Sequence, residues 1–230
     1  RWKRILIGYL SVIEADVFRH LETVSASNCS LEAMTAARTF ALDRFARVVP
    51  EHADPDELRR AIVRALNRPL RVCGVVRNQG EPGGAPFWIR ALDGCETIQI
   101  VEPAQVDMDD PDQAHIFHAA THFNPVDVVC SLRAFDGTSH DLEQFVAPDT
   151  AFVTRKTADG RALLALERPG LWNGSMAGWN TICVDVPAST FAPVKTIFDL
   201  LRPQHQFKRP RRQGADTTAA ITGTVLITRR

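Results

Sequence analysis

The sequence lacks several features that mark large classes of protein. No apolar run reaches the roughly 20 residues that a membrane-spanning helix needs. The 27 lysine and arginine residues equal the 27 aspartate and glutamate residues, so no net charge draws the 230-residue chain toward nucleic acid or an anionic membrane. These absences predict a protein that binds neither nucleic acid nor membrane.

The five cysteines form no C-x-x-C pair, and their number is odd. Three of them, Cys73, Cys130 and Cys183, lie inside apolar runs typical of strands. This pattern favours reduced cysteines in the core of a protein from a reducing compartment over disulfides or a zinc cluster. We therefore expect a cytoplasmic protein with free thiols.

The chain begins with Arg1, and the stretch Arg1–Leu10 has basic residues before apolar ones. Glu14 and Asp16 interrupt the apolar stretch early, and no small-residue cleavage site follows, so the stretch does not fit a signal peptide. It fits a helix that is entered from an upstream segment. We therefore expect the chain to be a fragment that lacks an upstream segment.

Hydrophobic periodicity predicts three helices in the first third of the chain. Apolar residues near a 3.6-residue period predict helices over Trp2–Thr23 and Leu31–Val49. Asp54 as N-cap, followed by Pro55, predicts the start of a third helix that runs to about Asn67.

After these helices the period shortens to that of strands. The predicted strands are Leu70–Val76, Phe87–Leu92, Thr97–Glu102, Val126–Leu132 and Thr181–Val186, with helices from Asp110 to about Ala120 and over Thr196–Leu201. The sequence therefore predicts an α/β protein with a mixed sheet and flanking helices. We expect a helical segment over 1–68, an α/β part over 69–206 and a poorly ordered tail over 207–230.

A loop rich in glycine and proline follows the first predicted strand. The segment Asn78–Pro86 contains Gly80, Gly83 and Gly84 together with two prolines. Glycines let backbone N–H groups approach a ligand closely, as anion sites require. Gly83 and Gly84 are therefore candidate binding residues, and an ordinary turn between strands is the alternative.

Three histidines, His115, His118 and His122, have a spacing that would place them on one face of a continuous helix. A metal site is one interpretation of this spacing. Phe123-Asn124-Pro125 predicts that the helix ends near His122, and no thiolate pattern or H-E-x-x-H motif lies nearby. The sequence therefore favours surface and helix-end histidines, with no metal.

Three further side chains suit a phosphorylated sugar. Asn124 stands between a predicted helix and a buried strand, where its amide can exchange hydrogen bonds with sugar hydroxyls or only organise the turn. Asn173 lies in a segment with two tryptophans. Their rings either stack on a sugar or base, or pack against the core and hold the loop in place. Lys195 follows Pro193 on a stiff turn, where it is a phosphate clamp or a surface lysine.

Several long segments resemble a known bacterial family. RVCGVVRNQGEPGGAPFW, THFNPVDVVC, PGLWNGSMAGWNTICVDVP and TFAPVKTIFDLLRPQHQ closely resemble the C-terminal part of the family called domain of unknown function 4301. The resemblance runs from about Trp2 to Gln206. It carries no activity by itself.

The same segments are also similar, more distantly and in the same order, to the UDP-sugar pyrophosphorylases. The matching segments are Gly74–Val76, Val101–Gln105, Phe123-Asn124 and Val186–Leu201. This similarity implies the C-terminal half of a nucleotide-diphospho-sugar transferase fold. It also implies that Glu102 and Asn124 hold the sugar, that Gly74 lines its pocket, and that Lys195 neutralises phosphate charge.

The implied reaction converts a nucleoside triphosphate and a sugar 1-phosphate into a nucleotide sugar and pyrophosphate, with Mg²⁺ as cofactor. The nucleotide loop and the metal ligands of those enzymes match nothing in this sequence. The resemblance therefore implies that they lie in the missing N-terminal half and that the fragment is inactive alone. A non-catalytic module that binds a sugar nucleotide, and a truncated remnant without a ligand, are the alternatives.

Overall fold

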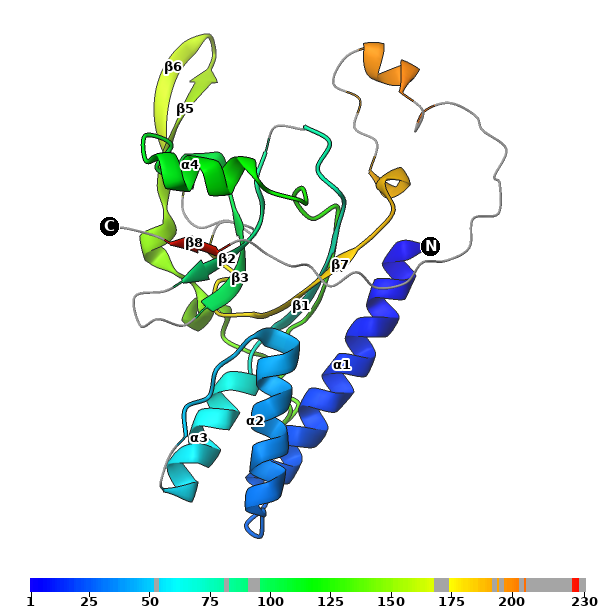
Figure 1. The fold of residues 1–230 in the computed structure, drawn as a ribbon, viewed down its shortest axis with the longest axis vertical. Coiled ribbons are helices and arrows are strands. Elements are labelled where there is room, and N and C mark those ends of the chain that lie inside the picture. The colour runs from blue at the N-terminus through cyan, green and yellow to red at the C-terminus, as the bar shows by residue number, and fades with distance from the viewer. Residues whose placement is uncertain are drawn as a thin grey trace.

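The computed structural model describes most of the chain (Figure 1). The described residues are 1–51, 54–80, 83–90, 96–167, 174–191, 194, 197–202, 205 and the backbone of 225–227. They form a layer of three helices, a central three-stranded sheet, a second three-stranded sheet and a two-stranded hairpin. The chain is therefore an α/β protein with parallel and antiparallel strand pairs, as the sequence predicts.

The helical layer consists of α1 (Trp2–Ser25), α2 (Leu31–Phe45) and α3 (Pro55–Leu66). The three helices pack on one another, and α1 also lies on the central sheet. Asp54 caps α3 by accepting a hydrogen bond from the backbone N–H of Asp56, as its position predicts. Helix α2 ends earlier than Val49, where the sequence placed its end, because Ala46 is left-handed with φ 52°.

The central sheet has the strand order β4-β1-β7. Strand β1 (Leu70–Val75) pairs in antiparallel fashion with β4 (Asp127–Ser131) and in parallel with β7 (Asn180–Asp185). Val72, Val129 and Val186 belong to the core formed with the helices, so the helical layer covers one face of this sheet. All residues of β1 are buried, which fits its nearly continuous apolar sequence.

A second sheet has the order β3-β2-β8. Strands β2 (Ala85–Arg90) and β3 (Glu96–Val101) form an antiparallel pair, and residues 91–95 between them lie outside the described residues. Strand β8 (Val225–Ile227) pairs in parallel with β2. It is the part of the tail that the structure describes.

A two-stranded hairpin projects from the rest of the molecule (Figure 1). Strands β5 (Phe152–Ala158) and β6 (Arg161–Glu167) are joined by Asp159 and Gly160, with φ of 50° and 75°. Positive φ at both turn residues is typical of the tight turns that match the twist of a hairpin. Neither strand is among those that the sequence predicts.

The remaining regular elements are short. They are α4 (Pro111–His118) and the 3₁₀ turns η1 (Pro103–Gln105), η2 (Leu142–Phe145), η3 (Pro148–Thr150), η4 (Ala188–Thr190) and η5 (Ile197–Leu201). The sequence predicts a short helix over Thr196–Leu201, and the structure has the 3₁₀ turn η5 there. Within the described part, no helix combines the length and the apolar character needed to cross a membrane.

The four cysteines among the described residues are free. Cys73 is buried in β1, as expected of a core thiol, but Cys130 is exposed. The prediction of a core position for Cys130 is wrong because β4 is an edge strand and this side chain points away from the helical layer. Cys95 lies outside the described residues.

Candidate functional site

The candidate site lies at the carboxyl ends of β1 and β7, which meet at one edge of the central sheet because the two strands are parallel. The segment that follows α4 runs along the end of β1. Its Phe123 N–H donates to the carbonyl of Val76 at 2.9 Å, and His122 forms a bridge with Arg77. This pairing places alternate side chains on opposite faces, so His122 and Asn124 share one face while Phe123 packs against the helical core.

Asn124 meets Glu102, which follows β3, although 22 positions separate them in sequence. The Asn124 Nδ2 donates a hydrogen bond to Glu102 Oε1 at 3.2 Å. The two side chains meet beside Gly84. A Cβ atom added there would lie 2.7 Å from the carbonyl oxygen of Val101 and 2.8 Å from Asn124 Oδ1, so only glycine fits this position.

Gly83 is constrained in the same way by a different neighbour. Its φ is 154°, and an added Cβ would lie 2.8 Å from the ring of Phe123. The loop of glycines therefore closes on the Asn124 segment, and its role is close approach of backbone to side chains. Of the residues selected from sequence, the structure brings together Glu102, Asn124, Gly83 and Gly84.

The backbone around Glu102 holds its carboxylate in place. The N–H of Glu102 donates to Gln105 Oε1 at 3.0 Å, and Gln105 Nε2 donates to the carbonyl of Thr150 at 3.1 Å. Asn124 Oδ1 is buried and has no hydrogen-bond partner among the described residues. Buried acceptors are nearly always paired in native proteins, so a free one next to a placed carboxylate fits a site that receives hydroxyl donors.

A second polar group extends the site. Arg77 Nε lies 3.3 Å from Asp185 Oδ2 at the end of β7, and His122 Nε2 lies 3.8 Å from the same oxygen. His122 Nδ1 shares a hydrogen bond of 2.8 Å with the hydroxyl of Thr121. The Arg77 side chain is about half exposed, so an anion can reach its guanidinium group.

The prediction that His122 is a surface or helix-end histidine is wrong. Helix α4 ends at His118, and the His122 side chain is 4% exposed, so it is neither a surface residue nor a helix-end residue. Burial lowers the pKa of His122, and the charge of Arg77 lowers it further, while Asp185 partly opposes both. The spacing of the three histidines suggested one helix that continues to His122, whereas the chain leaves α4 after His118.

The lowered pKa predicts a loss of stability in acid. Below the ordinary histidine pKa of about 6.5, the unfolded chain takes up a proton at His122 that the folded chain does not bind. The free energy of unfolding therefore decreases as the pH is lowered. Denaturant titrations across this range measure the slope. His122→Gln should flatten it, whereas an equal slope in the variant would contradict the assignment. Part of the slope should remain, since the pKa values of His20 and His140 are also lowered by burial.

A buried cation lies further along the same face of the central sheet. Arg71 is fully buried, and its Nε donates to Thr181 Oγ1 at 2.8 Å while Nη2 has no partner among the described residues. Cys73 lies two residues on, with Cys183 directly opposite it on β7. A hydrogen bond from Cys183 and the charge of Arg71 lower the pKa of Cys73. This face of the sheet is therefore polar where the face under the helices is apolar.

The other residues selected from sequence lie elsewhere. Gly74 faces the helical layer, where an added Cβ would lie 3.0 Å from Leu6 and 3.4 Å from Val186, so glycine there lets α1 pack closely on β1. Asn173 and Lys195 fall outside the described residues. In the described part, no three side chains of His, Cys, Asp or Glu are grouped so that they could hold a metal ion.

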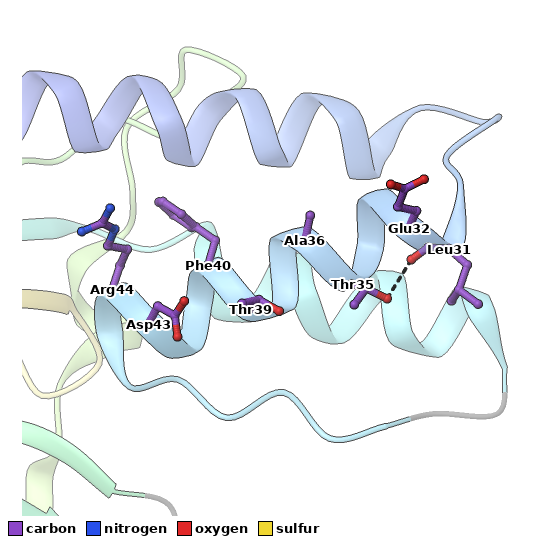
Figure 2. A pocket seen from close by; sticks show the side chains of 8 residues that line it. All are labelled: Leu31, Glu32, Thr35, Ala36, Thr39, Phe40, Asp43 and Arg44. Atoms are coloured by element: carbon purple, nitrogen blue, oxygen red, sulfur yellow. Dashed lines mark hydrogen bonds between the residues drawn. The ribbon is translucent and has the colours of Figure 1, made fainter.

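A shallow groove runs along α2 (Figure 2). It is lined by Leu31, Glu32, Thr35, Ala36, Thr39, Phe40, Asp43 and Arg44. Phe40 points toward α1, where its ring lies 4.6 Å from that of His20. The groove is the surface of one helix, and it brings together none of the residues selected from sequence.

Comparison with protein families finds the family named by the closer of the two resemblances. The chain matches the family described as a domain of unknown function (DUF4301) over residues 1–206. No protein of curated function matches the chain. Because the match covers the helical layer and the strands that form the candidate site, the chain belongs to the DUF4301 family.

Proposed function

We propose that this chain binds a phosphorylated sugar, as a sugar phosphate or a nucleotide sugar, at the contact between Glu102 and Asn124. In the complete protein the reaction is nucleotidyl transfer from a nucleoside triphosphate to a sugar 1-phosphate. The observation that carries the proposal is the hydrogen bond between Glu102 and Asn124 beside Gly84, with Asn124 Oδ1 left buried and without a partner in the described structure.

The chemistry of these groups suits a sugar. The Glu102 carboxylate accepts hydrogen bonds from hydroxyl groups, and the free oxygen of Asn124 accepts one more. A site built to hydrogen-bond hydroxyl groups discriminates strongly against ligands that lack them, because its buried polar groups would then stay unpaired. The ligand is therefore a polyhydroxylated ring.

The charge of the neighbouring groups suits a phosphate. Arg77 presents a partly exposed guanidinium, whose planar fork matches phosphate oxygens. Asp185 shares that guanidinium in the present structure, so a phosphate would compete with it. By resemblance, Lys195 adds a second cation. Phosphoryl chemistry depends mainly on positioning and charge neutralisation, which is the work assigned to these side chains.

The proposed transfer needs no covalent enzyme intermediate. An oxygen of the sugar phosphate attacks the α-phosphorus of the nucleoside triphosphate, and pyrophosphate leaves. By resemblance, Mg²⁺ would assist with ligands from an N-terminal half. The described residues supply no group of metal ligands, so we assign them only the binding and orientation of the sugar phosphate.

Calorimetry with sugar 1-phosphates and nucleotide sugars tests the binding step. Asn124→Ala should weaken binding about tenfold, since a hydrogen bond in such a site contributes about 1–1.5 kcal/mol. Asn28→Ala is the matched control because Asn28 is exposed in the turn between α1 and α2. Equal affinities of parent and Asn124→Ala protein, or no binding by the parent, would refute the site.

Pyrophosphate release by the full-length protein tests the catalytic step. Binding without release would leave a module that only holds the ligand. If release is seen, Lys195→Ala should slow it strongly while leaving the folded state unchanged in circular dichroism. An unchanged rate would remove Lys195 from the mechanism without affecting the binding site at Asn124.

A further inference from the structure

The projecting hairpin has an apolar face that the rest of the described structure leaves open. On β6, Leu164 and Leu166 are 70% and 67% exposed, and Val153 on β5 is 60% exposed. Val153 is directly opposite Leu166, so these side chains lie on one face of the hairpin. An isolated two-stranded sheet is only marginally stable in water, and this one exposes the side chains that would normally stabilise it.

The two edges of the hairpin are not equivalent. Strand β5 contacts η1 at the base of the hairpin, whereas β6 pairs only with β5 within the described residues. Natural proteins usually protect an edge strand with proline, a bulge or a central charge. The interior of β6, between Arg161 and Glu167, has only alanine and leucine, and its pairing with β5 is regular throughout. Such an edge is a template for another strand.

The sequence of β6 is complementary to itself. When R-A-L-L-A-L-E is laid antiparallel on a second copy with Leu164 opposite Leu164, Arg161 meets Glu167 at both ends. Ala162 then meets Leu166, and Leu163 meets Ala165, so each large side chain faces a small one except at the centre. Directly opposite residues in an antiparallel pair point to the same face, so charged pairs and apolar pairs both form.

We propose that β6 pairs with β6 of a second copy of this chain around a two-fold axis at Leu164. The product is a continuous sheet of strand order β5-β6-β6-β5, with an isologous interface in which the same patch serves both copies. The pairing satisfies the open hydrogen-bonding edge and joins the two apolar faces into one. Glu167, which already contacts Lys156 at 2.7 Å, gains Arg161 of the second copy as another cation.

Analytical ultracentrifugation of the intact chain over a concentration series tests this proposal. We expect a monomer–dimer equilibrium in the parent protein. Leu164→Lys should give a monomer at every concentration, because two like charges would meet on the two-fold axis. Leu31→Lys is the matched control, since Leu31 is equally exposed but lies on α2. A monomeric parent, or a Leu164→Lys protein that dimerises as the parent does, would overturn the proposal.

Disulfide crosslinking tests the register separately from folding. In a Cys130→Ser background, which removes the one thiol classed as exposed among the described residues, Leu164→Cys should form a disulfide-linked dimer under mild oxidation. Ala162→Cys should not, because it faces Leu166 and the two introduced thiols would be several residues apart. Equal crosslinking by the two variants would overturn the register, and crosslinking by neither in a dimeric protein would place the interface elsewhere.

Discussion

Replacing Asn180 with aspartate should lower the free energy of unfolding by about 2–4 kcal/mol. Asn180 is buried at the start of β7, and its Nδ2 donates to the carbonyl oxygens of Ala65 and Leu66 at the end of α3. Its Oδ1 accepts from Arg47 at 3.3 Å. A carboxylate keeps the contact with Arg47 but turns an oxygen toward the two carbonyl oxygens, which then lose their donor.

Urea denaturation of Asn180→Asp and parent protein measures this effect. The penalty should grow as pH rises, because the buried carboxyl group is more easily protonated in the folded state, where its protonated form can donate to a carbonyl. Asn28→Asp is the exposed control and should leave stability nearly unchanged. A buried position that tolerated the aspartate would mean that Asn180 does not tie α3 to the central sheet.

Replacing Gly84 with alanine should destabilise the protein by about 1–3 kcal/mol, the usual effect of added volume in a packed site. The added Cβ would lie 2.7 Å from a backbone oxygen of β3, which cannot move without disturbing the pairing of β2 with β3. Glu102 and Asn124 would also be pushed apart. The same variant should therefore lose affinity for the proposed sugar ligand.

Gly8→Ala provides a control with the opposite sign. An added Cβ at Gly8 meets nothing within 4 Å, and the residue lies inside α1, where alanine favours the helix by about 1 kcal/mol. Thermal unfolding should therefore place the two variants on opposite sides of the parent protein. If Gly84→Ala were as stable as the parent, the close approach of the glycine loop to Asn124 would be absent in solution.

The sequence identified the helices and most strands because their signals are local. The proline after Asp54 fixed the start of α3, and the apolar run of β1 fixed a strand buried on both faces. The end of α2 escaped prediction because Ala46 adopts a left-handed backbone without being glycine. Strands β5 and β6 were not predicted because the hairpin buries little surface. Their sequences therefore lack the alternation of apolar and polar residues that packing on a core imposes.

The candidate site also contains some residues that were selected from the sequence and others that only the structure brought together. Glu102 and Asn124 were selected from short motifs, and the structure brings them into hydrogen-bond contact. Arg77 and Asp185 were not selected, because each is unremarkable among its sequence neighbours, and His122 was interpreted as a surface or helix-end residue. They come together only because β1, β7 and the segment after α4 lie side by side.

By itself the sequence determined the α/β class, the helix starts and the glycine loop, since capping, periodicity and turn chemistry act over a few residues, while Glu102 was selected through a family resemblance. Only the tertiary structure decided that His122 is buried, that Gly74 packs against α1, and that one edge of β6 is unpaired within the described residues. The reason is physical: burial and the pairing of distant charges depend on which strands become neighbours, and strand pairing is a long-range choice that no local pattern encodes.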